Sequence, residues 1–497
     1  MRYILFLMIA SLIFNSSCSS LAKPKRAISS SEQMGIDLSR EANLIVDMVS
    51  TREIKSENCE GELGNLIRDY QLMTPQNIDL TVLKNDGQLI LDQSFKARIA
   101  LHSLLEVMPR SCKMKLKELN LLMRASEDYV GILFYNDPQI SASSIKFDEQ
   151  PVPIMENAAY HPYHVGIGLD ASSKFEFKNG DIMITKGVSF VSSTISEIAH
   201  PRSLFSHIVF VHVDKKTKEV TTLESYVGKG VGIYKIEDAL KNENARILVL
   251  RSRDSELASR AADYMFEKVT ELKKKNKIIP YDYQLDFSDN SKLSCEEVVY
   301  DSFKQVSNGN VILPEAMSQI TMVDEKFLKR VGLKKGAMMT PADMETDSRF
   351  DIVLDWTDYR LMRDSWRKDA ILGEMFRWID EYNYQIHENL SSIAAKAIWS
   401  TRYIPKLWGM LAKLSGIPKD FTKDVPSLTI STMASLKTIG GIMLPIIEKV
   451  DEEYFAKNGK WMSTDMLREA LEKFRESKPK DLRKVFSEER AVELPNY

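Results

Sequence analysis

A block of strand-and-turn sequence at residues 175–250 constrains the fold most, because it lies between two long stretches whose apolar residues recur at helical spacing. Short apolar runs bounded by turn residues predict strands at residues 182–184, 205–213, 220–227 and 246–250. Gly228, Gly230 and Gly232 predict a tight loop after the third run. Residues 35–127 and most residues after 360 have the helical pattern. The chain is therefore predicted to be an α+β protein.

The changes of pattern along the 497 residues also predict the domain organisation. We expect a signal peptide at 1–17, a tether at 18–34, a helical N-terminal module at 35–135, a linker at 136–174, a sheet-containing domain at 175–360 and a helical C-terminal module at 361–497. The linker contains His161 and His164, which we do not place in the catalytic site.

The C-terminal module is unusual in two respects. All six tryptophans lie between residues 356 and 461, where they indicate helix packing or, alternatively, an aromatic surface for glycan or lipid. Residues 426–447 are nearly free of charge, but Lys437 and Pro445 favour a buried or interfacial segment over a membrane-spanning helix.

The first residues have the features of a bacterial export signal. Arg2 precedes an apolar run at 3–14 that is too short to span a bilayer, and small residues follow before Cys18. Residues 15–18 resemble a lipoprotein processing box in which Cys18 is acylated. Asn15 stands where that pattern usually has Leu, and secretion without a lipid is the alternative. We expect an exported protein, periplasmic or anchored to the outer membrane through the lipid.

Composition agrees with a soluble globular domain and excludes one class of partner. The chain is 44% hydrophobic and 28% charged, with a formal net charge of -3. A balance of this kind gives no indication of a polyanion-binding surface, so we expect no nucleic-acid partner.

Export makes each of the four cysteines informative, because disulfides persist in an oxidising compartment. Cys59 and Cys112 lie in the same predicted module and form either a disulfide or two buried thiols. Cys18 is the expected site of lipid attachment. Cys295 is then left without a partner, and a free thiol kept in such a compartment is more often functional than one in the cytosol.

Cys295 lies at the predicted start of a helix. Ser294 and Glu297 have the spacing of a capping box, and Val298 and Phe303 continue at helical spacing. The helix dipole and the unpaired N–H groups of the first turn favour a thiolate at this position. The alternative is a small buried hydrophobic residue.

A predicted hairpin provides an imidazole and a carboxylate. Cysteine hydrolysis needs a thiolate, an imidazole that exchanges its proton and a group that orients the imidazole. If Val213 pairs with Val220, Glu224 is the diagonal neighbour of His207 on one face of the sheet. His212 points to the other face, so we rank it below His207.

The order His207, Glu224, Cys295 resembles that of the permuted papain-like cysteine hydrolases, the YiiX-like branch of the NlpC superfamily. The matching pieces lie within residues 175–355, roughly a third of the chain, at 180–182, 205–209, 223–224, 230–231, 280–283, 294–299 and 340–343. The resemblance implies a permuted papain-like catalytic domain, an antiparallel sheet or barrel with a nucleophile helix.

The resemblance also implies roles for individual residues. Cys295 would be the nucleophile, His207 the general base and acid, and Glu224 the residue that orients the imidazole. The backbone N–H of Cys295 is the expected oxyanion donor. The candidate residues of the substrate pocket are Ser206, Tyr226, Tyr281 and Ser294. Ser294 stands where the family commonly has an aromatic residue, which bears on the shape of the pocket.

We therefore predict an exported, lipid-anchored cysteine hydrolase that cleaves amide bonds, with cell-wall peptide as the favoured substrate and with no cofactor or metal. A lipid or thioester hydrolase or an acyltransferase with the same three residues is the closest alternative, because the family includes relatives that act on acyl chains. A catalytically silent scaffold with a structural Cys295 is the alternative from a different class.

Overall fold

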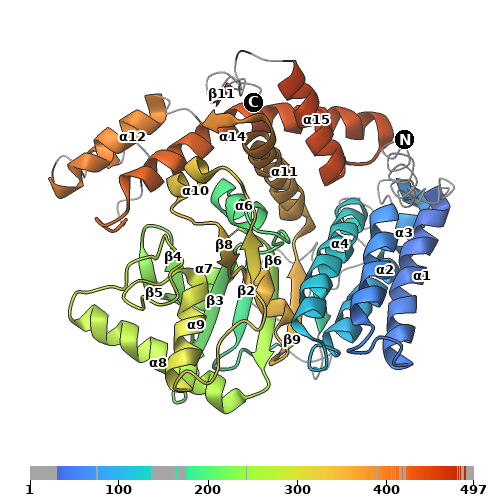
Figure 1. Ribbon diagram of the computed structural model, residues 1–497, viewed down its shortest axis with the longest axis horizontal. Helices are drawn as coiled ribbons and strands as arrows, with labels where there is room; N and C mark the ends of the chain where they lie inside the picture. The colour runs from blue at the N-terminus through green and yellow to red at the C-terminus, as the bar shows by residue number, and fades with distance from the viewer. Residues whose placement is uncertain are drawn as a thin grey trace, which may run out of the picture.

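The described chain is a mixed α+β protein with a central antiparallel sheet and helices on its flanks (Figure 1). The computed structural model describes residues 31–73, 77–135, 163–165, 175–241, 243–386, 390–404, 406, 408, 410–412, 417, 421–477, 480, 482 and 486–488. The predicted signal peptide, Cys18, His161 and most of the predicted linker lie outside the described residues.

The N-terminal bundle consists of four helices that share one apolar core. They are α1 (Ser31–Ser50), α2 (Cys59–Leu72), α3 (Leu80–His102) and α4 (Arg110–Tyr135). A disulfide between Cys59 and Cys112 joins α2 to α4 across a sequence separation of 53 residues, which decides between the two alternatives for these cysteines. Since α1 begins at Ser31, the tether predicted at 18–34 was extended too far toward the C-terminus.

The central sheet has seven strands in the order β1-β9-β6-β2-β3-β4-β5, and each neighbouring pair is antiparallel. Its strands are β1 (Tyr163–Val165), β2 (Ile182–Gly187), β3 (His207–Val213), β4 (Val220–Tyr226), β5 (Gly230–Lys235), β6 (Asn244–Ser252) and β9 (Phe350–Thr357). The four predicted strands are β2, β3, β4 and β6. Two expectations were wrong: the predicted loop at Gly228–Gly232 is a turn that leads into β5, and residues 163–165 of the predicted linker form an edge strand beside β9.

Alternation along the strands gives the sheet two apolar faces. Ile208 and Phe210 of β3 point to the face covered by α8 (Ser255–Lys274) and α9 (Cys295–Val306). Val209 and Val211 point to the opposite face, which α7 (Ile236–Lys241) covers in part. The helix α6 (Phe190–Glu197) connects β2 to β3. Between α9 and β9 the chain forms β7 (Ser318–Ile320), α10 (Glu325–Val331), β8 (Gly336–Met338) and the short helix η4 (Pro341–Thr346).

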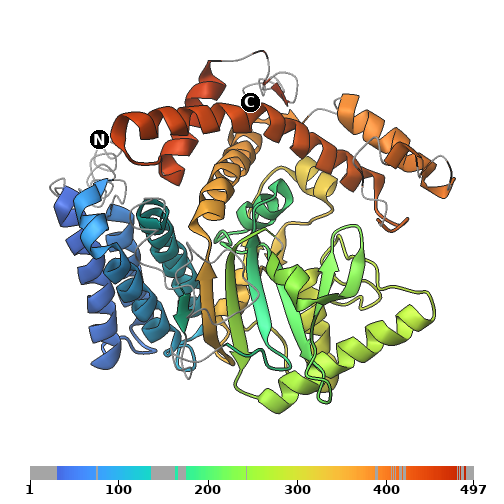
Figure 2. The same ribbon diagram turned by 180° about the vertical axis from the view of Figure 1, so that it is seen from behind.

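The C-terminal module lies across one end of the sheet (Figures 1 and 2). Its helices are α11 (Tyr359–Tyr382), α12 (Leu390–Ser400), η5 (Thr401–Tyr403), α14 (Ser427–Asn458) and α15 (Thr464–Glu476). A two-stranded sheet of β10 (Tyr384–Ile386) and β11 (Phe486–Glu488) interrupts the expected helical pattern. Trp378 and Trp399 are fully buried.

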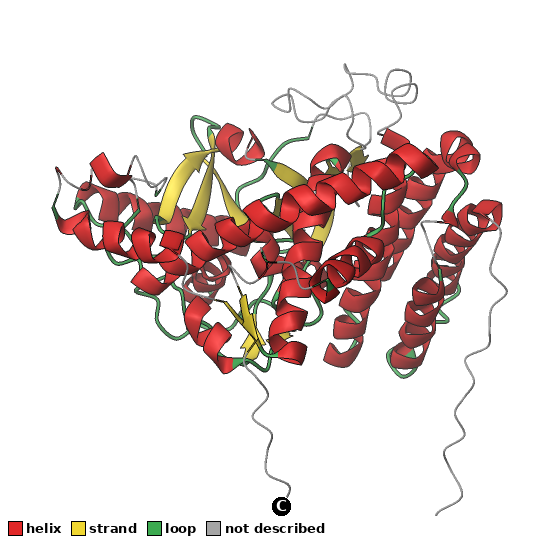
Figure 3. Cartoon of the chain, turned by 90° about the horizontal axis from the view of Figure 1, so that it is seen from above, coloured by secondary structure: helices red, strands yellow, loops and turns green. Residues whose placement is uncertain are grey.

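The helix α14 is the one described helix that is long and apolar enough to cross a membrane by length and composition. Half of its most apolar window is buried against the rest of the protein. Seen from above, the long helices lie over the strands of the sheet (Figure 3). The buried residues of α14 are therefore part of the protein interior.

Candidate functional site

The hairpin of β3 and β4 brings the predicted imidazole and carboxylate together. Val213 pairs with Val220, and the register continues through Phe210 opposite Leu223. Continuing this register places Glu224 diagonally from His207, as the parity argument predicted. The Nε2 atom of His207 lies 2.9 Å from Oε2 of Glu224. The predicted contact is confirmed.

Glu224 is fully buried and is held by donors on its own strand. The hydroxyl of Thr222 donates to Oε1 at 2.5 Å, and the hydroxyl of Tyr226 donates to Oε2 at 2.6 Å. Burial opposes the charge of the carboxylate, but the bonds from His207, Thr222 and Tyr226 outweigh it and lower the pKa of Glu224. The Tyr226 ring also stacks on the His207 imidazole, with centroids 5.0 Å apart. Glu224 is thus an ionised acceptor that fixes the ring.

Cys295 is the first residue of α9, as the sequence predicted. The Ser294 hydroxyl accepts from the N–H of Glu297 at 3.4 Å, and the Glu297 carboxylate accepts from the N–H of Ser294 at 2.7 Å, so the capping box is present. The Ser225 hydroxyl of β4 donates to the carbonyl of Leu293 at 2.5 Å. This bond ties the strand that carries Glu224 to the loop that leads into α9.

The environment of the thiol differs from the expectation. Burial and the adjacent carboxylate of Glu296 raise the pKa of Cys295 well above its usual range. The Cys295 thiol donates to Oε2 of Glu296 at 3.2 Å, while the backbone N–H of Ile208 acts in the opposite direction by stabilising the thiolate. The sequence predicted a thiolate at the helix terminus. In the structure, burial and the Glu296 carboxylate outweigh the backbone hydrogen bonds that favour the thiolate, so the pKa of Cys295 is raised.

Cys295 and His207 line one cavity of about 290 Å³, which we call the Cys295 cavity. Its other lining residues include three of the predicted pocket residues, Ser206, Tyr226 and Tyr281. The Ser206 hydroxyl also accepts a hydrogen bond from the backbone N–H of Gly187, at 3.1 Å. Ser294 does not line this cavity, nor the second cavity described below. Its hydroxyl is buried and caps α9, so its prediction as a pocket residue is not supported.

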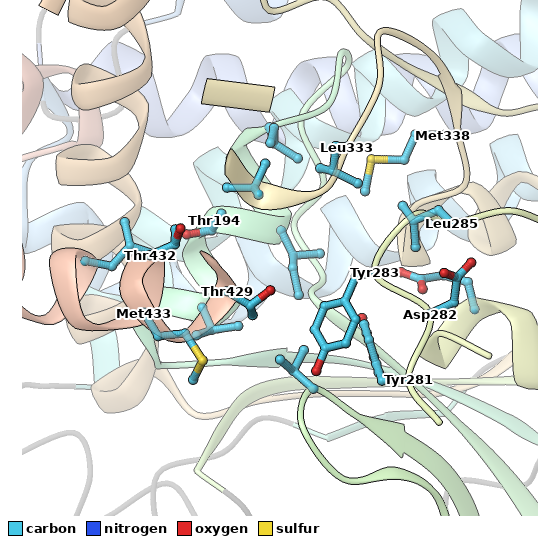
Figure 4. Close-up of a pocket in the computed structure, with 17 residues that line it drawn as sticks. Thr194, Tyr281, Asp282, Tyr283, Leu285, Leu333, Met338, Thr429, Thr432 and Met433 are labelled. Atoms are coloured by element: carbon cyan, nitrogen blue, oxygen red, sulfur yellow. The ribbon is translucent and has the colours of Figure 1, made fainter. Parts of the chain in front are cut away.

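A second cavity of about 130 Å³, which we call the apolar pocket, adjoins the Cys295 cavity. Figure 4 shows the residues that line the apolar pocket. The two share the lining residues Val191, Ile195, Val227, Tyr281 and Met433. Glu296, next to Cys295, also lines the apolar pocket. In Figure 4, Thr429 and Met433 of α14 face Tyr283 across the pocket.

Among the histidines whose side chains the structure describes, His102, His200 and His212 line neither cavity. His212 stacks on Phe266 of α8, with centroids 3.9 Å apart, on the opposite side of β3 from His207. This agrees with its lower rank in the sequence analysis. The backbone of His164 lies in β1, and its side chain is outside the described residues. In the described ranges, no group of three or more His, Cys, Asp and Glu side chains is arranged to hold a metal ion.

Two residues of the site were missed in the sequence. Thr222 alternates with Glu224 and Tyr226 along β4, so strand parity could have placed it beside the carboxylate. Glu296 gave a weaker signal, because an acidic residue in the first turn of a helix is normally read as a favourable dipole partner.

A scan against protein-family models and a search of curated proteins each found no match to this chain.

Proposed function

We propose that this protein is an exported cysteine hydrolase that cleaves amide bonds through Cys295, His207 and Glu224, in a permuted papain-like domain. The observation that supports it most is that His207, hydrogen-bonded to a buried carboxylate, lines the same cavity as the free thiol of Cys295. Export and the resemblance to cell-wall hydrolases favour a peptide of the cell wall as the substrate.

The hydrogen bonds around His207 assign its proton. An ionised Glu224 can only accept, so the Nε2 atom of His207 carries the hydrogen and donates it. In the neutral ring with its hydrogen on Nε2, the other nitrogen, Nδ1, is able to accept a proton. His207 is in this way prepared as a general base, and Glu224 stabilises the imidazolium that forms.

The reaction starts from a neutral thiol, because the pKa of Cys295 is raised. His207 takes the thiol proton as Sγ attacks the carbonyl carbon of the substrate, and the carbon–nitrogen bond breaks as the same proton passes to the leaving amine. Water then attacks the thioester, with His207 accepting its proton. A carboxylic acid leaves, and the proton returns to the sulfur.

The test is hydrolysis of purified cell-wall peptides by the wild-type protein and by Cys295→Ala. We expect the variant to lose at least about a thousandfold in kcat/KM with little change in melting temperature, because the thiol supplies the covalent intermediate. His207→Ala should lose a similar factor, whereas His212→Ala, on the same strand but on the other face, should remain active. Cleavage by Cys295→Ala at the wild-type rate would rule out the nucleophile.

A thiol-reactive probe followed by mass spectrometry tests the same residue without assuming a substrate. Labelling of Cys295 that is lost in His207→Ala supports the proposal. A wild-type protein whose Cys295 reacts with no probe and that cleaves no peptide would support a silent scaffold instead.

A further inference from the structure

We propose that the outer part of the C-terminal module docks on an anionic lipid surface, which gives the protein a membrane contact separate from the predicted lipid on Cys18. This part, which we call the projection, consists of the described residues among 390–428: α12, η5 and the segment that leads into α14. It lies at the edge of the molecule, where α12 packs against α14 (Figures 1 and 2). The inference does not depend on the proposed hydrolase activity.

The helix α12 is apolar on the face that it turns to solvent as well as on the face that it buries. Trp399 packs into a small core with Ile430 of α14. Ile393 and Ala397, one helical turn apart on the other side of α12, are exposed. The solvent face of a helix in a soluble protein is normally polar, yet Lys396 is the one charged residue of α12. The exposed face of α12 therefore has the composition of a docking surface.

Further apolar side chains are exposed along the same segment. Tyr403, Ile404 and Met410 are each more than half exposed, at 61%, 55% and 58%. Trp399 and Trp408 instead pack edge to face within the projection, with centroids 5.3 Å apart. These tryptophans hold the projection together, while tyrosine and aliphatic side chains form its surface.

Cations lie beside these exposed rings and aliphatic chains. The guanidinium of Arg402 lies over the rings of Trp399 and Tyr403, 4.8 Å and 4.5 Å from their centroids. The Nζ atom of Lys423 is 5.8 Å from the centroid of Tyr403, and Lys406 is exposed nearby in the sequence. Interfacial segments that bind anionic membranes combine aromatic and aliphatic residues with lysine and arginine in this way.

The charge balance of the projection selects a lipid surface as its occupant. The sequence from 390 to 428 contains six lysines and arginines against two aspartates, a net charge of +4, in a chain whose formal net charge is -3. Each cation held near an anionic membrane raises affinity about fivefold. A second copy of the chain, docked by the same face, would instead bring like charges together.

The predicted lipid anchor makes a surface contact of this kind effective. Ser31, where α1 begins, is 13 residues after Cys18, a separation of at most about 45 Å for any chain conformation. A tether of this length keeps the protein beside the membrane, so a weak second contact forms at high effective concentration. The projection would then determine which side of the protein faces the membrane.

The experiment measures cosedimentation with phospholipid vesicles of a chain that begins at residue 19. This chain retains every described residue and lacks the predicted signal peptide and Cys18. We expect binding to vesicles made of equal parts of phosphatidylglycerol and phosphatidylcholine. Binding to phosphatidylcholine alone should be at least about tenfold weaker, because the cations of the projection then have no anionic partner.

A pair of charge variants locates the contact. Lys406→Gln combined with Lys423→Gln should weaken binding to the anionic vesicles at least about tenfold. Lys55→Gln combined with Lys216→Gln changes the net charge by the same amount at exposed lysines outside the projection, and should change binding less than about twofold because distant charges are screened.

A pair of apolar variants tests the other half of the surface. Ile393→Ser combined with Ile404→Ser should weaken binding at least about tenfold through the loss of apolar contact. Val107→Ser combined with Ile312→Ser changes exposed aliphatic side chains outside the projection and should bind like the wild type. Because all four positions are exposed, melting temperatures close to that of the wild type verify that these proteins are folded.

Two results would overturn the proposal. The first is no binding to anionic vesicles, or equal losses in the projection variants and their controls. The second is dimerisation without lipid that Ile393→Ser combined with Ile404→Ser abolishes, measured by sedimentation velocity, because a second copy of the chain would then cover the exposed face.

Discussion

The two helical modules attach to the sheet-containing domain with different proportions of charged and apolar contacts. The N-terminal bundle meets it with buried charges. Arg98 of α3 and Arg124 of α4 both bond to Oδ2 of Asp355 on β9, at 2.8 Å and 2.9 Å. Lys117 of α4 donates to Oδ1 of Asp343 at 2.7 Å, and all these side chains are buried.

The C-terminal module has fewer buried ion pairs with the domain, Lys186 with Asp369 and Arg468 with Glu197, and packs on it mostly with hydrocarbon. On α14, Leu436, Ile439 and Met443 belong to one apolar core with α6 and α11. This interface also contains the apolar pocket. Hydrophobic contacts are non-directional, so they can be exchanged for contacts with a ligand.

The difference teaches how each interface constrains the site. Removing one partner from a buried ion network leaves a charge without compensation in a buried site, which is strongly destabilising. An apolar contact has no charge to compensate and can leave space for part of a substrate. We therefore expect charge changes to act on stability at the first interface and volume changes to act on the second.

The largest effect is expected from a change at Asp355, the carboxylate that both Arg98 and Arg124 contact. Asp355→Asn leaves Arg98 and Arg124 with one charged partner fewer in a buried site, and we expect the free energy of unfolding to fall by about 3–5 kcal/mol. Denaturant unfolding measures it. Asp351→Asn is the matched control on the same strand, because its pair with Arg253 is partly exposed and contributes about 1 kcal/mol or less. Equal losses in the two variants would contradict the comparison.

A smaller effect concerns pH at the same interface. Burial lowers the pKa of His102 from 6.5 to about 4, and in the described residues neither ring nitrogen has a hydrogen-bond partner. The unfolded chain takes up this proton first, so the contribution of His102 is fully present above pH 6.5 and is lost as pH falls toward 4. By linkage the loss approaches about 3 kcal/mol.

His102→Leu should therefore flatten the decline of unfolding free energy between pH 6.5 and 4.5 relative to the wild type. Other titrating groups are common to both proteins, so the difference between the two curves isolates His102. Parallel curves would show that His102 does not contribute.

The smallest effect tests packing at the second interface. A Cβ added at Gly440 of α14 would collide with the ring of Phe190 on α6, whereas one added at Gly441 would meet open space. We expect Gly440→Ala to cost about 2 kcal/mol through overpacking, and Gly441→Ala to stabilise by about 0.5–1 kcal/mol through helix propensity. Unfolding free energies of the two variants give the comparison. Similar values would mean that α14 does not press on α6 there.

Local sequence patterns predicted much of the fold and part of the candidate site. The capping box at Ser294, the β3–β4 register and the contact between His207 and Glu224 follow from spacing and strand parity, which act over a few residues. β5 was missed because Gly230 and Gly232 have a turn-like composition, although paired glycines can extend a ladder.

The remaining features depend on partners far along the chain. Lys113, Lys117 and Arg124 recur along one face of α4, where a charged face is normally solvated. Their acids, Glu315, Asp343 and Asp355, come more than 200 residues later, so burial of this face was not visible locally. The raised pKa of Cys295 likewise depends on how completely the fold covers the sulfur.

Burial of the Cys295 sulfur also affects how long it resists oxidation outside the cytoplasm, where we predict that the protein resides. Peroxide oxidation and exchange with other disulfides both proceed through the thiolate. Because the pKa of Cys295 is raised, less of it is thiolate, which slows both routes unless a base such as His207 removes the proton. The sulfur can then persist unoxidised until a substrate carbonyl arrives, while the Cys59–Cys112 pair remains cross-linked in the same surroundings.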